Sequence, residues 1–278
     1  MPIKPLKFKR GKNHFFLLII FIFTSCNFEK PAFKYSNFYD TPAENIAIAI
    51  KKNDAEDIRE EILKNKVNVN FKDGEYEVSL LGLSIANDRK DAFIELLKLG
   101  ANPNITNSYC VSPLITAIRY NKNCDLYFVK ELLDYNAQIN PRFFDKCNDF
   151  THDPISETIL HYNDENKIEC GLEILKVLTE KLDNPELLDQ YNNPEDFHEN
   201  IVYTCINTNK NLSALKYLMV DLKFKVPDKI FIDGTVLLNY NGYKSLEEIL
   251  NSREFSFNES NKFREKAKKE ILYYLEKK

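Results

Sequence analysis

The side chains in this sequence best able to do chemistry are its 6 cysteines and 4 histidines. The histidines are His14, His152, His161 and His198. No two of them have the four-residue spacing of a helical zinc site, and none belongs to a His-Glu-x-x-His motif. Acid pairs such as Glu60-Glu61 fall between apolar positions of expected helices, where solvent exposure explains them. We therefore predict no catalytic site, no bound metal and no cofactor.

The cysteines also lack the spacing of a metal or redox centre. They are Cys26, Cys110, Cys124, Cys147, Cys170 and Cys205. No two of them form a Cys-x-x-Cys pair, which argues against a zinc ribbon or a thioredoxin-like site. Their roles must therefore come from the elements that position them.

The N-terminus has the pattern of an export signal. Five basic residues and no acid precede an unbroken apolar run, Phe15–Phe23, and small residues follow it. Nine helical residues rise only ~14 Å, about half of the ~30 Å hydrocarbon core, so the run is too short to span a membrane. A basic region, a short apolar run and small residues indicate a secretory signal over residues 1–25. A buried core helix is the alternative, but five neighbouring cations argue against it.

The segment Phe23-Thr24-Ser25-Cys26 resembles the lipobox of bacterial lipoproteins. The resemblance implies that Cys26 is acylated and becomes the first residue of the mature chain. Phe23 stands where Leu is usual, and an ordinary secreted cysteine is the alternative. Asn27 stands where an Asp would imply retention in the inner membrane. The implied location is therefore the outer membrane, facing the periplasm, with residues 26–41 as a tether.

The charge of the chain differs between its signal and its body. The formal net charge is -4, but residues after the signal hold 33 Lys and Arg against 42 Asp and Glu, a net of -9. An acidic body gives no electrostatic reason to expect nucleic acid as a partner. With only 7 glycines, the chain is also poor in glycine-rich phosphate loops and tight β-turns.

From about Asn45 onward the sequence repeats itself at a period near 33–36 residues, which predicts a solenoid. Ser79–Ala86 aligns with Ser112–Ile118, and Ile94–Asn104 aligns with Val129–Asn140. Ser112 is placed to cap a helix, and Pro113 suits its first position. Gly100 and Asn136 fall where a second helix ends and left-handed backbone is favoured. Each unit therefore predicts a pair of helices.

These units resemble the ankyrin repeat, with its Thr-Pro-Leu-x-x-Ala opening and its Leu-Leu-x-x-Gly-Ala-x-x-Asn close. The resemblance implies an all-α solenoid of helical pairs with short hairpin joints, about six units over residues 42–257. Another helical-pair solenoid is the alternative architecture. Over residues 258–278, Phe263, Ala267, Ile271 and Leu275 form one apolar stripe on a charged helix. Such a helix suits a C-terminal cap, which must cover one apolar face and expose the other face to water.

The later units follow the pattern more loosely. A fourth covers Asp153–Leu178 after an expanded hairpin at Pro141–Asp153, a fifth covers Ile201–Met219, and a sixth covers Gly234–Leu250. Cys205 occupies a small-residue position of the fifth unit, so we expect a buried, inert thiol.

In this arrangement Cys110 and Cys147 fall in neighbouring hairpins. Export to an oxidising compartment permits disulfides, and we predict one between these two residues. Cys124 and Cys170 open the second helices of consecutive units, roughly 10 Å apart by helix packing, which would strain a bond between them. Free cysteines throughout are the alternative.

Ankyrin-like proteins, as the resemblance implies, bind other proteins through hairpin tips and the concave helix face. The candidate anchors are aromatic residues of the hairpins, because exposed aromatic rings often dominate binding energy. They are Tyr76, Tyr109, Phe143, Phe144 and Phe150. The alternative is that these rings pack locally on the scaffold.

The sequence therefore predicts a lipid-anchored envelope scaffold that recruits, shields or neutralises another protein. Its expected contacts are that protein and, through the N-terminal lipid, the membrane. One alternative is a structural stabiliser of an envelope assembly. Another is an undetected hydrolase, which a strongly perturbed His152 or His161 in a cleft would favour.

Overall fold

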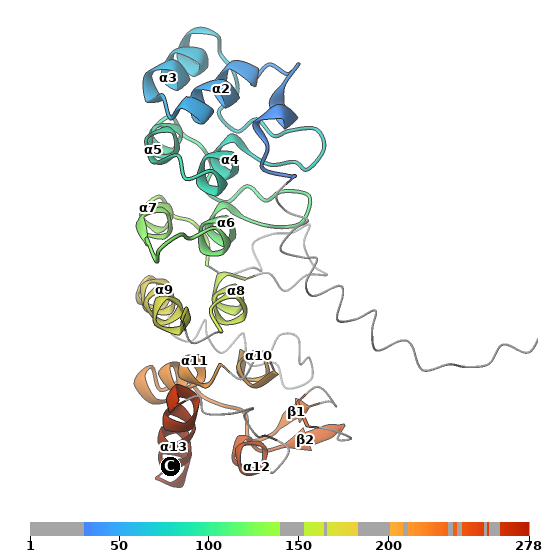
Figure 1. Cartoon of the computed structure of the whole chain (residues 1–278), viewed down its shortest axis with the longest axis vertical. Coiled ribbons are helices and arrows are strands. Elements are labelled where there is room, and N and C mark those ends of the chain that lie inside the picture. Colours follow the sequence, from blue (N-terminus) through green and yellow to red (C-terminus); the bar gives the residue numbers. More distant parts are fainter. Residues whose placement is uncertain are drawn as a thin grey trace, which may run out of the picture.

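The computed structural model describes residues 31–139, 153–163, 166–182, 201–207, 211–232, 236–237, 241–252, 255 and 262–277. Helices of this part of the chain stack in two columns (Figure 1). The pairs are α2 (Glu44–Lys52) with α3 (Ala55–Lys64), α4 (Leu80–Ala86) with α5 (Lys90–Lys98), α6 (Pro113–Arg119) with α7 (Tyr127–Asp134), α8 (Pro154–His161) with α9 (Ile168–Glu180), and α10 (Ile201–Asn207) with α11 (Leu212–Lys216). The first helices of the pairs form one column and the second helices the other, which is the predicted all-α, ankyrin-like architecture.

The first helices begin at side-chain caps that the sequence encodes. The Ser79 hydroxyl accepts from the Gly82 amide, and the Ser112 hydroxyl accepts from the Ile115 amide. Asp153 accepts from two amides in the first turn of α8. These bonds satisfy amides that have no partner within the helix. The predicted cap at Ser112 is confirmed, with Pro113 at the start of its helix.

The second helices end where left-handed backbone was predicted. Gly100 has φ 91° and Asn136 has φ 63°. Beyond them, the amides of Ala101 and Ala137 each reach back 2.9 Å to a leucine carbonyl of the preceding helix. The two units therefore end with the same hydrogen bond, which turns the chain toward the next hairpin.

Small residues allow the helices to pack closely in the interior of the stack. Ser84, Ala117 and Cys205 are fully or almost fully buried on the first helices of their units. Burial raises the pKa of the Cys205 thiol well above its ordinary value, because the thiolate would have no water around it. Cys205 is a free, buried cysteine, as predicted from its position in the repeat.

The predicted sixth unit, Gly234–Leu250, contains one described helix at its second half, and most of its expected first helix lies outside the described residues. Around it, β1 (Ile230–Ile232) pairs antiparallel with β2 (Gly242–Lys244), and the helix α12 (Leu246–Asn251) follows. Ile230 and Ile232 are buried and Phe231 between them is less so, which is the alternation of a strand and not of a helix.

The last helix, α13 (Lys262–Glu276), packs against α11 and α12 at the end of the stack. Ala267 and Ile271 of the predicted apolar stripe are buried. The helix therefore covers the final apolar face while its charged side faces water, as expected of a capping helix.

Residues 31–39, called here the strap, belong to the predicted tether, residues 26–41, and pack on the stack. Ala32, Phe33 and Phe38 are buried, and the 3-10 helix η1 (Tyr35–Phe38) packs against α2. The aromatic residues of the strap pack against rings of the stack: Phe33 lies against Tyr120, and Phe38 lies against Phe71. Within the described residues, the helices are all too short or too polar to cross a membrane.

Candidate protein-binding surface

The second unit opens with a hairpin folded around the carboxylate of Asp73. This side chain is 2% exposed. One of its oxygens accepts from the amides of Glu75 and Tyr76, at 2.9 and 2.7 Å, and the other accepts from Val78 at 2.7 Å. Three hydrogen bonds to one side chain fix the backbone of the tip.

Asn107, 34 residues later, fixes the backbone of the next hairpin in the same way. Its side-chain oxygen accepts from the amides of Tyr109 and Val111, at 2.9 and 3.0 Å. The Asn107 amide also donates to the Val111 carbonyl at 3.1 Å. The two tips are therefore built on equivalent short polar residues.

Direct bonds join the two tips. Both the amide and the hydroxyl of Ser108 donate to the Tyr76 carbonyl, each at 2.9 Å. The Lys72 ammonium, from the first hairpin, donates to the Thr106 carbonyl of the second hairpin at 3.1 Å. Successive tips therefore form one continuous ridge.

Two predicted anchors meet on this ridge. The rings of Tyr76 and Tyr109 stack with centroids 6.3 Å apart and an interplanar angle of 27°. Tyr109 is 45% exposed and Tyr76 is half-buried. A hydrogen bond with Glu75 raises the pKa of the Tyr76 hydroxyl above its ordinary value. The pair, called here the tip pair, presents fixed aromatic area with polar edges, which suits protein recognition.

Tyr76 and Tyr109 also pack locally, which is the alternative considered from the sequence. Tyr76 covers one side of Tyr109, so the two readings are compatible: one ring supports the other. The predicted anchors Phe143, Phe144 and Phe150 lie outside the described residues. So does the predicted lipid attachment site, Cys26.

The cysteine predictions need one correction. Cys124 and Cys170 form a disulfide, with Cα atoms 5.5 Å apart, within the usual range. The predicted strain assumed equivalent positions on stacked helices. Instead, Cys124 lies in the loop before α7, where it and Asn123 both have positive φ, and Cys170 lies in the first turn of α9.

Cys110 is also disulfide-bonded. Its predicted partner, Cys147, lies outside the described residues, so the Cys110–Cys147 pairing stays a prediction.

A polar cluster links the third and fourth units. The Arg119 guanidinium donates two bonds to the Glu157 carboxylate, at 2.7 and 2.8 Å, and both side chains are largely buried. His161 lies nearby, and burial is the main cause that lowers its pKa. The Tyr162 hydroxyl donates to the Ile118 carbonyl at 2.8 Å. These hydrogen bonds join α6 to α8 and to the residue that follows α8.

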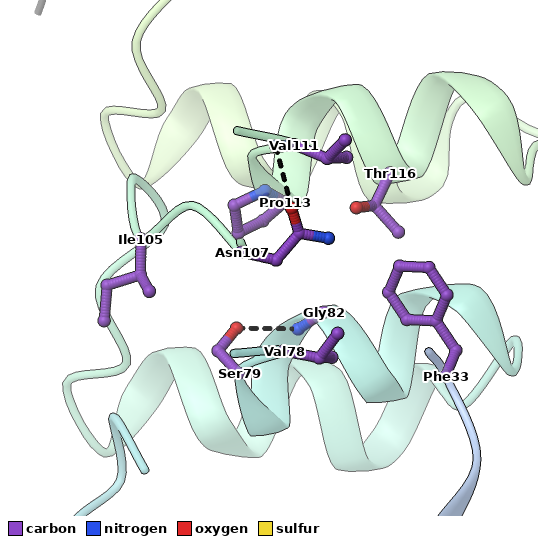
Figure 2. A pocket seen from close by; sticks show the side chains of 9 residues that line it. All are labelled: Phe33, Val78, Ser79, Gly82, Ile105, Asn107, Val111, Pro113 and Thr116. Atoms are coloured by element: carbon purple, nitrogen blue, oxygen red, sulfur yellow. Dashed lines mark hydrogen bonds between the residues drawn. The ribbon is translucent and has the colours of Figure 1, made fainter. Parts of the chain in front are cut away.

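A small notch lies between the hairpins of Asp73 and Asn107 and the helices α4 and α6 (Figure 2). Val78, Asn107 and Val111 come from the hairpins, and the ring of Phe33 reaches in from the strap. In the described part of the chain, His, Cys, Asp and Glu nowhere gather in threes that could hold a metal.

Three features of the described structure were not predicted from the sequence: the fold of the hairpin around Asp73, the Arg119–Glu157 pair and the packing of the strap. Asp73 and Asn107 lie one repeat period apart, and this spacing could have indicated that both residues fold a hairpin. The other two depend on contacts between residues far apart in the chain, for which the sequence gives no local signal.

Comparison with known proteins gives one informative likeness. An ankyrin repeat protein of fowlpox virus (strain NVSL) is 34% identical over 109 residues, which are 38% of this chain and 31% of the viral protein. The aligned part therefore spans less than a third of that relative. No family model matches the chain. The helical pairs, their shared end geometry and this relative together support ankyrin repeats, and the chain has an all-α, ankyrin-like fold.

Proposed function

We propose that the protein is a lipid-anchored scaffold of a bacterial envelope, which recruits, shields or neutralises another protein through its hairpin ridge. The observation that carries the binding role is the tip pair. Tyr76 and Tyr109 are fixed by two hairpins and joined across them, so binding would cost little conformational entropy. The viral relative's description as an ankyrin repeat protein agrees with a scaffold.

The proposed location rests on the N-terminal sequence and on the disulfides. Residues 1–26 have the signal and lipobox pattern described above. Disulfides persist in oxidising compartments and are rare in the cytosol. The Cys124–Cys170 bond and the bonded Cys110 therefore support export. The absence of Asp after Cys26 favours the outer membrane, facing the periplasm.

The binding role can be tested in intact cells. A photoreactive phenylalanine analogue would replace Tyr109 or, as a matched control, Tyr243 of β2, which is 50% exposed. We expect a discrete crosslinked protein adduct from position 109 and none of the same mass from position 243. The same adduct from both positions, or no adduct at 109, would argue against the tip pair as the binding surface.

Anchoring is tested separately with Cys26→Ala. The variant should remain an unacylated precursor or be released from the membrane fraction, because the acylated side chain is missing. Equal membrane association and equal electrophoretic mobility of the variant and the wild type would refute the anchor.

A further inference from the structure

The strap is held by its own fold. The Asn37 side-chain amide donates to the carbonyls of Pro31 and Ala32, at 2.9 and 3.1 Å. Ala32 is 1% exposed and Phe38 is fully buried. The strap is therefore packed from Pro31 onward, ten residues before the expected end of the tether.

The strap is also bonded to the second and third units. The Asn87 side-chain amide donates to the Phe33 carbonyl at 3.0 Å, and the Arg89 guanidinium donates to the Tyr35 hydroxyl at 3.2 Å. The Phe33 ring packs edge-on against Tyr120, with centroids 5.2 Å apart. Moving residue 33 away from the stack would break contacts with two different units.

The position of the strap limits how far the stack can lie from an anchor at Cys26. Six Cα–Cα steps separate Cys26 from Ala32. A fully extended chain covers about 3.3–3.6 Å per residue. The segment from Cys26 to Ala32, called here the leash, therefore reaches at most about 22 Å. The 16-residue tether expected from sequence, with its 15 steps, would have reached at most about 54 Å.

The leash ends beside the tip pair. Phe33 shares the notch of Figure 2 with Val78 and Asn107, each two residues from a tyrosine of the pair. The helix α13, in contrast, lies at the opposite end of the stack (Figure 1). A short leash at the strap therefore brings the tip pair, and not α13, to the anchored side.

We propose that the short leash holds the tip pair next to the bilayer, so that the partner is an integral membrane protein or a protein bound to that same membrane. This inference rests on the lipid anchor proposed above. It does not depend on attraction to lipid headgroups, since the acidic body would be repelled by an anionic surface.

The test measures distance from the bilayer by energy transfer. Full-length protein, processed in a bacterial envelope, is reconstituted into phosphatidylcholine vesicles that contain a headgroup-labelled acceptor lipid. A donor dye is attached through a bioorthogonal amino acid at position 109 or at position 273 of α13, where the tyrosines are 45% and 63% exposed. We expect stronger transfer from position 109, unchanged when the salt concentration is raised.

A leash variant supplies the decisive comparison. A flexible 30-residue Gly/Ser insertion between Lys30 and Pro31 adds roughly 30 Å of root-mean-square length and should lower transfer from position 109 at least about twofold. The same insertion after Lys278 should leave it unchanged, and circular dichroism checks that both variants fold.

Vesicle flotation separates the two ways in which this can fail. If the protein floats with the vesicles but transfer from 109 equals that from 273, or ignores the leash insertion, the short leash is wrong and the anchor stands. If the processed wild type does not float, or Cys26→Ala floats equally well, the anchor is wrong and this inference falls with it.

Discussion

Asp153, the cap of α8, has a charge state tied to its burial. It is 3% exposed, and burial raises its pKa to about 6 despite the hydrogen bonds that it accepts. The nearby Glu157 adds to this increase. Between about pH 4 and pH 6 the folded protein keeps a proton that the unfolded chain releases, so stability should fall as the pH rises through this window.

The variant Asp153→Asn tests this account. Asparagine keeps an acceptor for the helix amides but cannot ionise. Denaturant unfolding should show the variant to be more stable than the wild type at pH 7, by on the order of 2–3 kcal/mol, and equal to it near pH 4. If both proteins show the same pH dependence between pH 4 and 6, Asp153 is not the titrating group.

Gly171 is required by a close approach between α9 and the end of α8. A Cβ there would lie 2.5 Å from the Cβ of Tyr162. Gly171→Ala should therefore destabilise the fold by about 1–3 kcal/mol, through overpacking, in urea unfolding. Gly74→Ala is the matched control, because nothing lies within 4 Å of its added Cβ. Equal, small effects of both substitutions would mean that the helices can shift apart freely.

At the scale of the elements, the Cys124–Cys170 disulfide ties the loop before α7 to the start of α9. The two residues are 46 positions apart. On the chain-entropy model, closing such a loop stabilises the fold by about 4 kcal/mol. Cys124→Ser with Cys170→Ser should therefore lower the unfolding free energy by about this amount, measured without reductant.

Cys205→Ser provides the comparison, since its thiol is free and its removal cuts no crosslink. Reductant should destabilise this variant as much as it does the wild type. It should destabilise the double variant less, leaving only the effect of the Cys110 bond. If the double variant and the wild type unfold alike without reductant, the crosslink does not stabilise the stack.

The elements show why some features could be predicted from sequence and others could not. The Ser112 cap and the left-handed Gly100 depend on interactions within a few residues, so the local sequence encodes them. The Arg119–Glu157 pair joins residues that are 38 positions apart, and the sequence near either residue does not indicate its partner. The strand at Ile230–Ile232 was not predicted, because a short apolar run fits a strand or a helix equally well.

At the scale of the whole molecule, ion pairs reinforce a stack in which each unit contacts its neighbours. Arg59 pairs with Glu95, Lys90 with Asp125, and Arg119 with Glu157, each joining consecutive units. The exposed Lys90–Asp125 pair contributes little, whereas separating the buried Arg119–Glu157 pair would leave a charge without its partner. Stability of this kind is close to a sum over neighbouring units.

The central claim is that this stack works at a membrane, held by the lipid on Cys26. The most direct test is the intact mass of the protein purified from the native envelope, measured without reduction and followed by sequencing of its N-terminal peptide. The account predicts a mature chain that begins at Cys26 and carries the mass of attached acyl groups. A chain that retains residues 1–25, or begins at an unmodified Cys26, would contradict it.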